Sequence, residues 1–449
     1  MSNLSEAIAQ CEINLARSPN DIASLNQLAM LEASAGQHTQ AFSHICAALR
    51  LAPNHPLLRY NLGQVHGSAG RFEDEIKAYQ QAIDLKPDFL EAYVNMGVAL
   101  RDMQRFDEAF EAFKQALRIN PDHPGARTNR AQTNLMLGNF EHGWRDYEWR
   151  WKDGHQSHDI KGVLWNGKTS LKGKRLLIHA EQGLGDTLQF VRYLDLLKSL
   201  GCIVFLRLQP PLAGLLSGYA GADMVIDTQS PVPEFDFHIP LLSLPHALYS
   251  RHPGIPCVHH YLTAAPEKVT YWSQWLAHKI NERTGTKAPA HTKKQLKIGL
   301  CWSGSTHHLN DQNRSMTLAQ WRTLFSQGCV FVSLQKEIRD ADLDTLDSHT
   351  DIVNAGLELN TFEDTAGLMC NLDLVITVDT SVAHLSAALG IPTWILLPEP
   401  ADWRWLRNRT DSPWYPSVRL FRQTVRADWS NVMDEVRQEL AALCQTSNE

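Results

Sequence analysis

The sequence predicts an α-helical solenoid followed by an α/β region whose two halves face each other across a cleft. Three observations predict it. Prolines recur at a fixed interval in the first third of the chain, strand-like apolar runs alternate with helix-like segments in the rest, and this alternation restarts after a polar segment at 278–294. The length of 449 residues suggests about three domains.

The interval between prolines defines the helical units. Four prolines are equally spaced: Pro19, Pro53, Pro87 and Pro121. Three series of mostly small residues recur at the same interval: Gly36, Gly70, Gln104 and Gly138; Ala29, Gly63, Gly97 and Ala131; and Ala48, Ala82 and Ala116. Small residues let paired helices approach, glycine turns the chain, and proline ends the second helix. The pattern, with its period of about 34 residues, resembles the tetratricopeptide repeat.

We therefore expect a tetratricopeptide-repeat domain over 1–152. It contains an incomplete first helix, three repeats at 22–55, 56–89 and 90–123, and a degenerate fourth at about 124–152. The fourth repeat has His155 where its closing proline would be and ends in the aromatic residues Trp144, Tyr147, Trp149 and Trp151. We expect these side chains to dock on the next domain; stacking on a ligand is the alternative.

A further periodic series suggests a role for the repeats. Asn61, Asn95 and Asn129 recur at the same interval as the prolines, each in the first helix of its repeat. Asparagine is a poor residue for a helix interior, but its amide can bond a peptide unit as donor and acceptor. The three residues could bind an extended acceptor peptide along the repeat groove, or bond neighbouring repeats or water. The protein O-linked acetylglucosamine transferases combine this repeat with a glycosyltransferase and use such a ladder, which the present arrangement resembles.

The remaining chain alternates strands and helices in two series. After a linker at 153–172, the first half at 173–277 has expected strands at 175–180, 203–208, 222–227 and 236–241 and helices at 186–200 and 212–219. After a second linker at 278–294, the half at 295–425 has expected strands at 296–303, 330–335, 351–356, 373–379 and 393–397 and helices at 317–325, 362–371 and 381–389. A C-terminal segment, 426–449, carries a last helix at 429–443 that we expect to pack back on the first half. Ligands bind such folds at the carboxyl ends of the strands.

The loop EQGLGDT at 181–187 joins the first strand of this region to a helix. Gly183 and Gly185 permit a tight turn, and Thr187 completes the loop. Asp186 lies at the start of the helix and faces the cleft, where it could act as a base; a plain helix cap is the alternative. The loop lacks the third glycine of a dinucleotide-binding motif.

A second loop, VDTSVAHLSAALGIP at 378–392, also runs from a buried strand into a helix. Asp379, Thr380 and Ser381 form the turn, and His384 lies on the first helical turn. Free amides at a helix start, assisted by hydroxyl groups, bind phosphate oxygens. The alternative is an ordinary helix cap with a satisfied histidine.

Together these loops resemble the heptosyltransferases of glycosyltransferase family 9 and their protein-modifying relatives. The Gly-Asp turn matches Gly185 and Asp186, and the Asp-Thr-x-x-x-His segment matches Asp379, Thr380 and His384. In the further matching segment at 302–321, the family's basic residue on the donor diphosphate corresponds best to Arg314. The resemblance implies the two-Rossmann GT-B fold, inversion of anomeric configuration and no metal requirement.

Two further residues are candidates because of their position alone. Gln335 and Lys336 end the expected strand VFVSLQ, where the donor base or ribose would lie. A lysine that is merely exposed is the alternative for Lys336.

Composition excludes several classes of function. The net charge of −7 and the pI of about 6.3 provide no basic field for nucleic acid or anionic lipid. No long, uninterrupted apolar run predicts a membrane span, and the N-terminus does not resemble a signal peptide, so we expect a cytoplasmic protein. The cysteines are scattered, without a C-x-x-C pair, and we expect neither a metal nor a cofactor.

The resulting functional prediction is an enzyme of class EC 2.4. It would transfer a sugar from a nucleotide sugar to a protein or peptide held by the repeats, with flagellin or another surface protein as candidate acceptor. One alternative is a heptosyltransferase-like enzyme that extends a lipid-linked or surface glycan. The other is a non-catalytic repeat scaffold that binds nucleotide. The sequence names neither the sugar, the nucleotide nor the acceptor.

Overall fold

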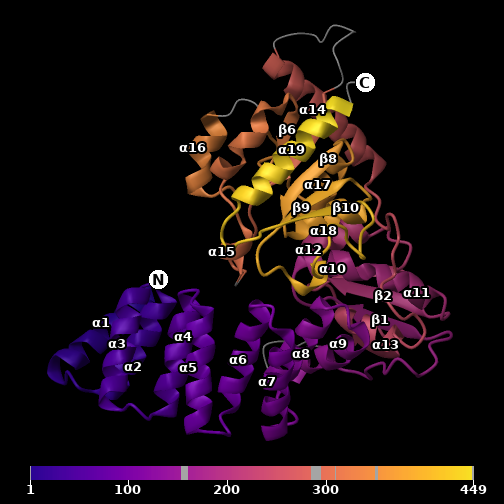
Figure 1. Cartoon of the computed structure of the whole chain (residues 1–449). Coiled ribbons are helices and arrows are strands. Elements are labelled where there is room, and N and C mark those ends of the chain that lie inside the picture. The colour runs from indigo at the N-terminus through magenta and orange to yellow at the C-terminus, as the bar shows by residue number, and fades with distance from the viewer. Residues whose placement is uncertain (1, 153–159, 285–294, 309, 349–351, 447–449) are drawn as a thin grey trace. The chain divides into compact units, whose positions relative to one another are not determined.

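The computed structural model describes residues 2–152, 160–284, 295–308, 310–348 and 352–446. The chain divides into two compact units, residues 1–158 and 159–449. Figure 1 shows helices alone in the first unit and helices around strands in the second. No helix among the described residues combines the length and the apolar composition that crossing a membrane requires.

The first unit consists of helix pairs in the expected register. A single helix, α1 (Ser2–Arg17), precedes four pairs and a short 3₁₀ helix: α2 (Ile22–Ser34) and α3 (His38–Leu51); α4 (Pro56–Ser68) and α5 (Phe72–Leu85); α6 (Leu90–Asp102) and α7 (Phe106–Ile119); α8 (Pro124–Met136) and α9 (Phe140–Tyr147); η1 (Glu148–Lys152). Each recurring proline lies just beyond the end of a helix, as its inability to continue a helix requires. The expected repeat boundaries are confirmed.

Two of the three small-residue series have separate physical causes. The turn position of every repeat has a positive φ, including Gln104 at 63°, which adopts a conformation that glycine adopts more easily. At the helix crossing, a Cβ on Gly63 would lie 2.5 Å from the Tyr79 ring, and one on Gly97 would lie 2.5 Å from the Phe113 ring. Glycine therefore leaves room for a buried aromatic ring from the second helix of the same repeat.

The second unit begins with a four-stranded parallel sheet in the order β3-β2-β1-β4. Its strands are β1 (Arg175–His179), β2 (Ile203–Leu208), β3 (Met224–Asp227) and β4 (Phe237–Pro240). The accompanying helices are α10 (Leu184–Phe190), η2 (Val191–Tyr193), α11 (Leu194–Lys198), α12 (Pro210–Leu216), η3 (Leu241–Ser243) and α13 (Leu244–Leu248). The helix expected at 186–200 is thus interrupted by one 3₁₀ turn.

A six-stranded parallel sheet follows in the order β10-β9-β8-β5-β6-β7. Its strands are β5 (Lys297–Cys301), β6 (Val330–Ser333), β7 (Ile352–Asn354), β8 (Leu374–Val378), β9 (Thr393–Leu397) and β10 (Val418–Arg422). Its shorter helices are α15 (Asp311–Arg314), η4 (Leu318–Gln327), α16 (Asp340–Ser348), α17 (Phe362–Met369), α18 (Ser381–Ala388) and η5 (Trp403–Trp405). The strand order reverses between β1 and β4 in the first sheet and between β5 and β8 in the second. Ligands of doubly wound folds bind at such points of reversal.

Two expectations about the second half are corrected. The linker expected at 278–294 begins inside a helix, α14 (Pro266–Thr284), which packs on α17 through a Lys268–Asp364 ion pair of 2.8 Å; residues 285–294 lie outside the described part. The C-terminal helix, α19 (Ser430–Thr446), packs on the second sheet and not on the first half, because Val432, Val436 and Leu440 join the core of that sheet. Figure 1 shows α19 in yellow beside this sheet.

The linker expected at 153–172 is also shorter than expected. Its first residues, 153–159, lie outside the described residues, whereas 160–172 lie against the first sheet. The Trp165 amide donates to the His238 carbonyl at 2.8 Å, and the Trp165 side chain is buried. Residues 160–172 therefore belong to the α/β unit.

Candidate functional site

The two loops singled out in the sequence lie next to each other. The loop after β1 leads into α10, the loop after β8 leads into α18, and the two helices are in contact. A Cβ on Gly185 would lie 2.8 Å from Cδ2 of His384 and 3.6 Å from Cα of Ser381. The absence of a side chain at Gly185 thus lets the first turns of both helices meet.

The Asp186 carboxylate is engaged on both oxygens. Oδ2 accepts the Gly183 amide at 2.9 Å, as in a helix cap, and Oδ1 forms an ion pair with Arg404. The side chain of Asp186 is mostly buried, and that of Arg404 still more so. The cap that we weighed as an alternative is present, together with a cation that the sequence did not indicate.

The neighbouring loop residue Thr187 helps to hold the turn in shape. Its side chain is buried and its hydroxyl donates to Gln209 Oε1 at 2.9 Å. Gln209 in turn donates to the carbonyl of Gln182, whose φ is 59°. These bonds fix the shape of the turn that presents Asp186.

His384 is a buried, neutral group at the centre of the site. Its Nδ1 lies 2.9 Å from the Tyr415 hydroxyl, and its ring stacks on Trp405 at 5.3 Å between centroids. Burial, reinforced by nearby guanidinium groups of which Arg404 has the largest effect, lowers the pKa of His384 well below its usual value. The charge at this position is therefore supplied by arginine and not by histidine.

The turn before α18 combines a capping role with a perturbed carboxyl group. Thr380 is buried, and its hydroxyl accepts the Val382 amide at 3.3 Å, so Thr380 is the N-cap of α18. Ser381 is partly exposed at the first helical position. Burial and the neighbouring Asp402 raise the pKa of Asp379 to about 6. Such a carboxyl group is costly to ionise next to Asp402.

The loop after β5 brings Arg314 to this turn. Arg314 Nη1 donates to the Asp379 carbonyl at 2.9 Å, and its side chain is mostly buried. A Cβ on Gly304 would lie 2.5 Å from Arg314 Nη2, so glycine is required where the guanidinium crosses the backbone. Among the described residues, Arg314 Nε and the Ser303 hydroxyl are buried without a hydrogen-bond partner. An oxygen-rich ligand could satisfy both groups.

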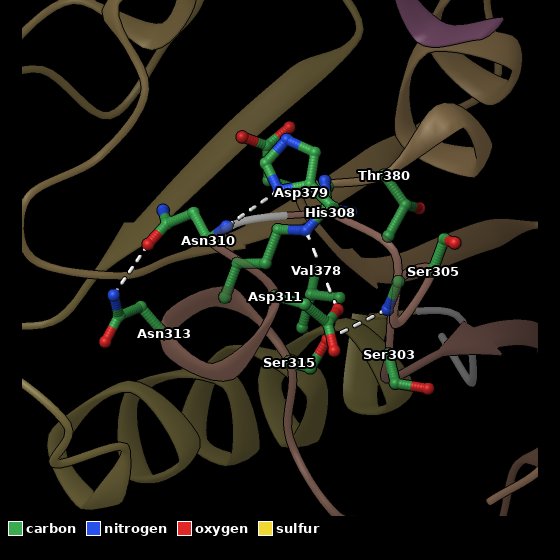
Figure 2. Close-up of polar contacts among 12 residues, drawn as sticks. Ser303, Ser305, His308, Asn310, Asp311, Asn313, Ser315, Val378, Asp379 and Thr380 are labelled. Carbon is green, nitrogen blue, oxygen red and sulfur yellow. Dashed lines mark hydrogen bonds and ion pairs between the residues drawn. The ribbon is translucent and has the colours of Figure 1, made fainter. Parts of the chain in front are cut away.

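The loop is held by its own polar network, which Figure 2 draws. The Ser315 hydroxyl donates to Asp311 Oδ1 at 2.6 Å and accepts the Gly304 amide at 2.9 Å. His308 lies in the same loop, and burial followed by the charge of Arg314 lowers its pKa.

Gln335 and Lys336 lie at the carboxyl end of β6, as expected, but in different surroundings. The buried Gln335 side chain accepts the amides of Trp302 and Ser303 at 3.2 and 3.0 Å and donates to the Ser303 carbonyl at 3.1 Å. Its amide therefore holds the loop after β5. Lys336 is exposed and donates to the Asn360 carbonyl at 3.2 Å.

The asparagines of the repeats bond within the repeat stack. Asn61 donates to Asn26 at 2.7 Å, and Asn95 donates to the Tyr60 hydroxyl at 2.8 Å, each reaching the preceding repeat. Asn129 donates to the Gly125 carbonyl in its own helix at 2.9 Å and accepts Arg101 Nη1 of the preceding repeat at 3.3 Å. Bonds between repeats, one of the two alternatives, are therefore observed for all three residues. Binding of an acceptor stays a prediction.

Sequence reasoning missed the residues that surround this site. Arg404 follows β9 and Tyr415 precedes β10, two segments to which no function was assigned. Arg192 is fully buried in η2, just after α10. It donates to the Tyr261 hydroxyl at 2.9 Å, and its guanidinium carbon lies 4.4 Å from the Tyr415 ring centroid. The run WRW at 403–405 could have indicated these residues. It places an arginine between two tryptophans shortly after a strand, a pattern typical of a buried polar site. Within the described residues, no group of three or more metal-ligating side chains is arranged to hold a metal ion.

Comparisons with known proteins identify the repeats. The family model of the tetratricopeptide repeat matches residues 20–88 and 90–123, so the first unit is a stack of these repeats, a type of scaffold that binds other proteins. Protein FlbA of Caulobacter vibrioides is 28% identical over 337 residues, which are 68% of this chain and 53% of that protein, so the chain spans about half the length of this relative. Because the first unit ends at residue 158, an alignment of that coverage extends into the α/β unit.

Solved structures of repeat proteins are similar to part of the chain. The crystal structure of MamA is 21% identical and covers 33% of this chain and 86% of its own, with a TM-score of 0.30. PilF of Pseudomonas aeruginosa is 19% identical and covers 35% and 71%, with a TM-score of 0.32.

Proposed function

We propose that the α/β unit is a glycosyltransferase that uses a nucleotide-sugar donor without a metal ion and inverts the anomeric configuration. The observation that carries this proposal is the meeting of α10 and α18, where Asp186 pairs with Arg404 and where the charges of Arg404 and Arg314 both act on His384. Both loops leave strands at the points where the sheet order reverses. A base and a cluster of cations at such a position suit transfer from a diphosphate leaving group.

In this mechanism Asp186 removes the proton of the acceptor hydroxyl while the bond between sugar and phosphate breaks. The diphosphate rests on backbone amides of the turn that follows Asp379, with Ser381 and Arg314 as further donors. Thr380 and Gln335 act indirectly, because their side chains shape the turn and the loop after β5. Neutral His384 adds a donor without adding charge.

The same residues support a GT-B enzyme similar to glycosyltransferase family 9. Two parallel sheets with reversing strand order are what that fold requires. Lys336, exposed at the end of β6, is proposed to lie near the donor ribose or base. A Lys336→Ala enzyme should then bind the donor more weakly; unchanged donor affinity would leave Lys336 as a surface lysine.

The proposed acceptor is a protein or peptide. The support is the repeat stack, a class of scaffold that binds protein segments. A surface protein such as flagellin is a candidate acceptor. A folded α/β unit, residues 160–449, that still glycosylated a purified glycan at the full rate would favour a glycan acceptor instead.

The deciding experiment is a thermal-shift screen of nucleotide sugars, followed by transfer assays with the donor that binds. A donor at 100 times its Kd should stabilise the protein by about 2.7 kcal/mol. Asp186→Asn should retain binding and lose about 10²–10⁴ in transfer rate. Transfer should persist in a chelator. A wild-type rate for Asp186→Asn, or chelator-sensitive activity restored by a divalent ion, would reject the corresponding part of the proposal.

A further inference from the structure

Arg404 is held by two carboxylates from different halves of the α/β unit. It lies in η5, after β9, and its guanidinium pairs with Asp186 in α10 and with Asp402 in its own loop, Nη1 to Oδ1 at 2.9 Å. The flat face of the guanidinium lies 4.2 Å from the centre of the Trp403 ring. Only 11% of the Arg404 side chain is exposed. The guanidinium is therefore held in place by groups of the protein itself.

This arrangement conflicts with the proposed chemistry of Asp186. The Asp186 carboxylate accepts the Gly183 amide on Oδ2 and pairs with Arg404 through Oδ1, so both of its oxygens are engaged. Asp186 can act as a base only after Arg404 leaves it.

The donor offers Arg404 a better partner. A diphosphate presents several charged oxygens, and a guanidinium fork binds two at once, whereas Asp186 gives it a single oxygen. Arg404 already acts electrostatically on both Asp379 and His384, the turn proposed to receive the diphosphate. The ion pair with Asp402 can keep the side chain at the site while its other nitrogen changes partner.

Building on the proposed function, we propose that Arg404 is a donor-responsive positioning residue: it pairs with Asp186 in the free enzyme and turns to the donor diphosphate when the donor binds, which frees Asp186. The freed carboxylate takes the acceptor proton as the acceptor oxygen bonds to the anomeric carbon. The bond from that carbon to phosphate breaks, and its electron pair leaves with the nucleoside diphosphate. The exchange would make the base available only when a donor is present.

The test is a double-mutant cycle read by binding and not by turnover. Kd values for ADP, GDP and UDP are measured by calorimetry on wild type, Asp186→Asn, Arg404→Met and the double variant. Asp186→Asn releases Arg404, so it should bind the recognised nucleoside diphosphate more tightly than wild type by about threefold or more. Arg404→Met should weaken binding about tenfold, as expected for loss of a charge-assisted bond, and should abolish the gain from Asp186→Asn.

Arg409→Met is the matched control. Arg409 lies in the same segment, and its ion pair with Asp411 at 2.6 Å involves a largely exposed carboxylate. This variant should bind as wild type does. Melting curves of each variant verify folding, and Arg404→Lys, which keeps the charge, should bind between wild type and Arg404→Met.

The outcomes separate the inference from the function on which it rests. If wild type binds none of the three diphosphates and no nucleotide sugar, the proposed function and this inference both fail. If wild type binds one of them, but Asp186→Asn brings no gain or the gain survives in the Arg404→Met background, only the exchange of Arg404 is refuted.

Discussion

Gly185 lies against the ring of His384, so closely that a Cβ at position 185 would be 2.8 Å from Cδ2 of the histidine. The two residues belong to helices that follow strands of different sheets. Because His384 is itself fixed by Tyr415 and Trp405, it has no free space into which to move. The spacing of the two helix starts therefore depends on a single hydrogen atom in place of a side chain.

Gly185→Ala should force α10 and α18 apart. Overpacking of this kind costs about 1–3 kcal/mol, and a displacement of the reacting groups by about 1 Å can lower a rate 10²-fold. Transfer assays and thermal melts check both effects. Gly183→Ala is the control, because a Cβ there would meet only Asp186 Oδ2, at 3.3 Å, and this variant should melt close to wild type. Equal activity of the two variants would contradict the prediction.

Asp379→Asn should stabilise the protein more at pH 8 than at pH 5. The pKa of this carboxyl is about 6 in the folded chain, above its ordinary value of 3.8. The folded state therefore binds the proton more tightly than the unfolded state. The protonated carboxyl makes its whole contribution to the free energy of unfolding below about pH 4, and this contribution is lost as the pH rises through 6. Asparagine does not ionise and so avoids that loss. The gain in the free energy of unfolding should therefore be about 1 kcal/mol larger at pH 8 than at pH 5. Thermal melts at both values measure it.

Asp411→Asn controls for removing a carboxylate from the same region. Its hydrogen bond with Arg409 holds the pKa of Asp411 below its ordinary value, the opposite direction from Asp379. The substitution should therefore bring no gain at pH 8. A gain of equal size for both variants would point to net charge as the cause.

If the three repeat asparagines bind the acceptor, their loss should change KM for the acceptor but not the affinity for the nucleotide-sugar donor. A triple variant with alanine at Asn61, Asn95 and Asn129 should raise KM for a protein acceptor severalfold and leave donor affinity unchanged, because a net hydrogen bond is worth about 0.5–1.5 kcal/mol. Steady-state kinetics with both substrates measures this. Tyr60→Phe separates the two roles, since it removes the partner of Asn95 but keeps the amide. If Tyr60→Phe raises KM as much as Asn95→Ala does, the ladder serves only the repeat stack.

Gly63→Ala should destabilise the repeat unit. The added methyl group would lie 2.5 Å from the ring of Tyr79, which is 2% exposed and cannot move out of the way. We expect a loss of about 1–3 kcal/mol, measured by chemical denaturation. Gly67→Ala, in the same helix, would meet only the flexible carboxylate end of Glu75, so it should be neutral or slightly stabilising.

The sequence predicted the repeats almost to the residue, because their period, turns and helix crossings are local properties of the chain. It also placed Asp186 and Asp379 in segments that follow strands of the two halves, since ligands bind such folds at the carboxyl ends of the strands. It could not find Arg404, because its partner Asp186 is distant in the chain and the pairing is set by packing of the two halves. Nor could it show that Gln335 faces backbone amides, because that depends on the shape of a loop from another strand.

Tyr79 packs over Gly63, and Phe113 packs over Gly97. Because each ring and its glycine lie in the two helices of one repeat, the whole repeat is the smallest piece that can be exchanged without disturbing this packing. A first helix carrying the glycine would leave a void if it were joined to a second helix with a small side chain, and the reverse graft would create a clash. Designs that lengthen or shuffle the stack should therefore move both helices of a repeat as one cassette. Gene duplication of one whole repeat, from the start of its first helix to the end of its second, would preserve the match.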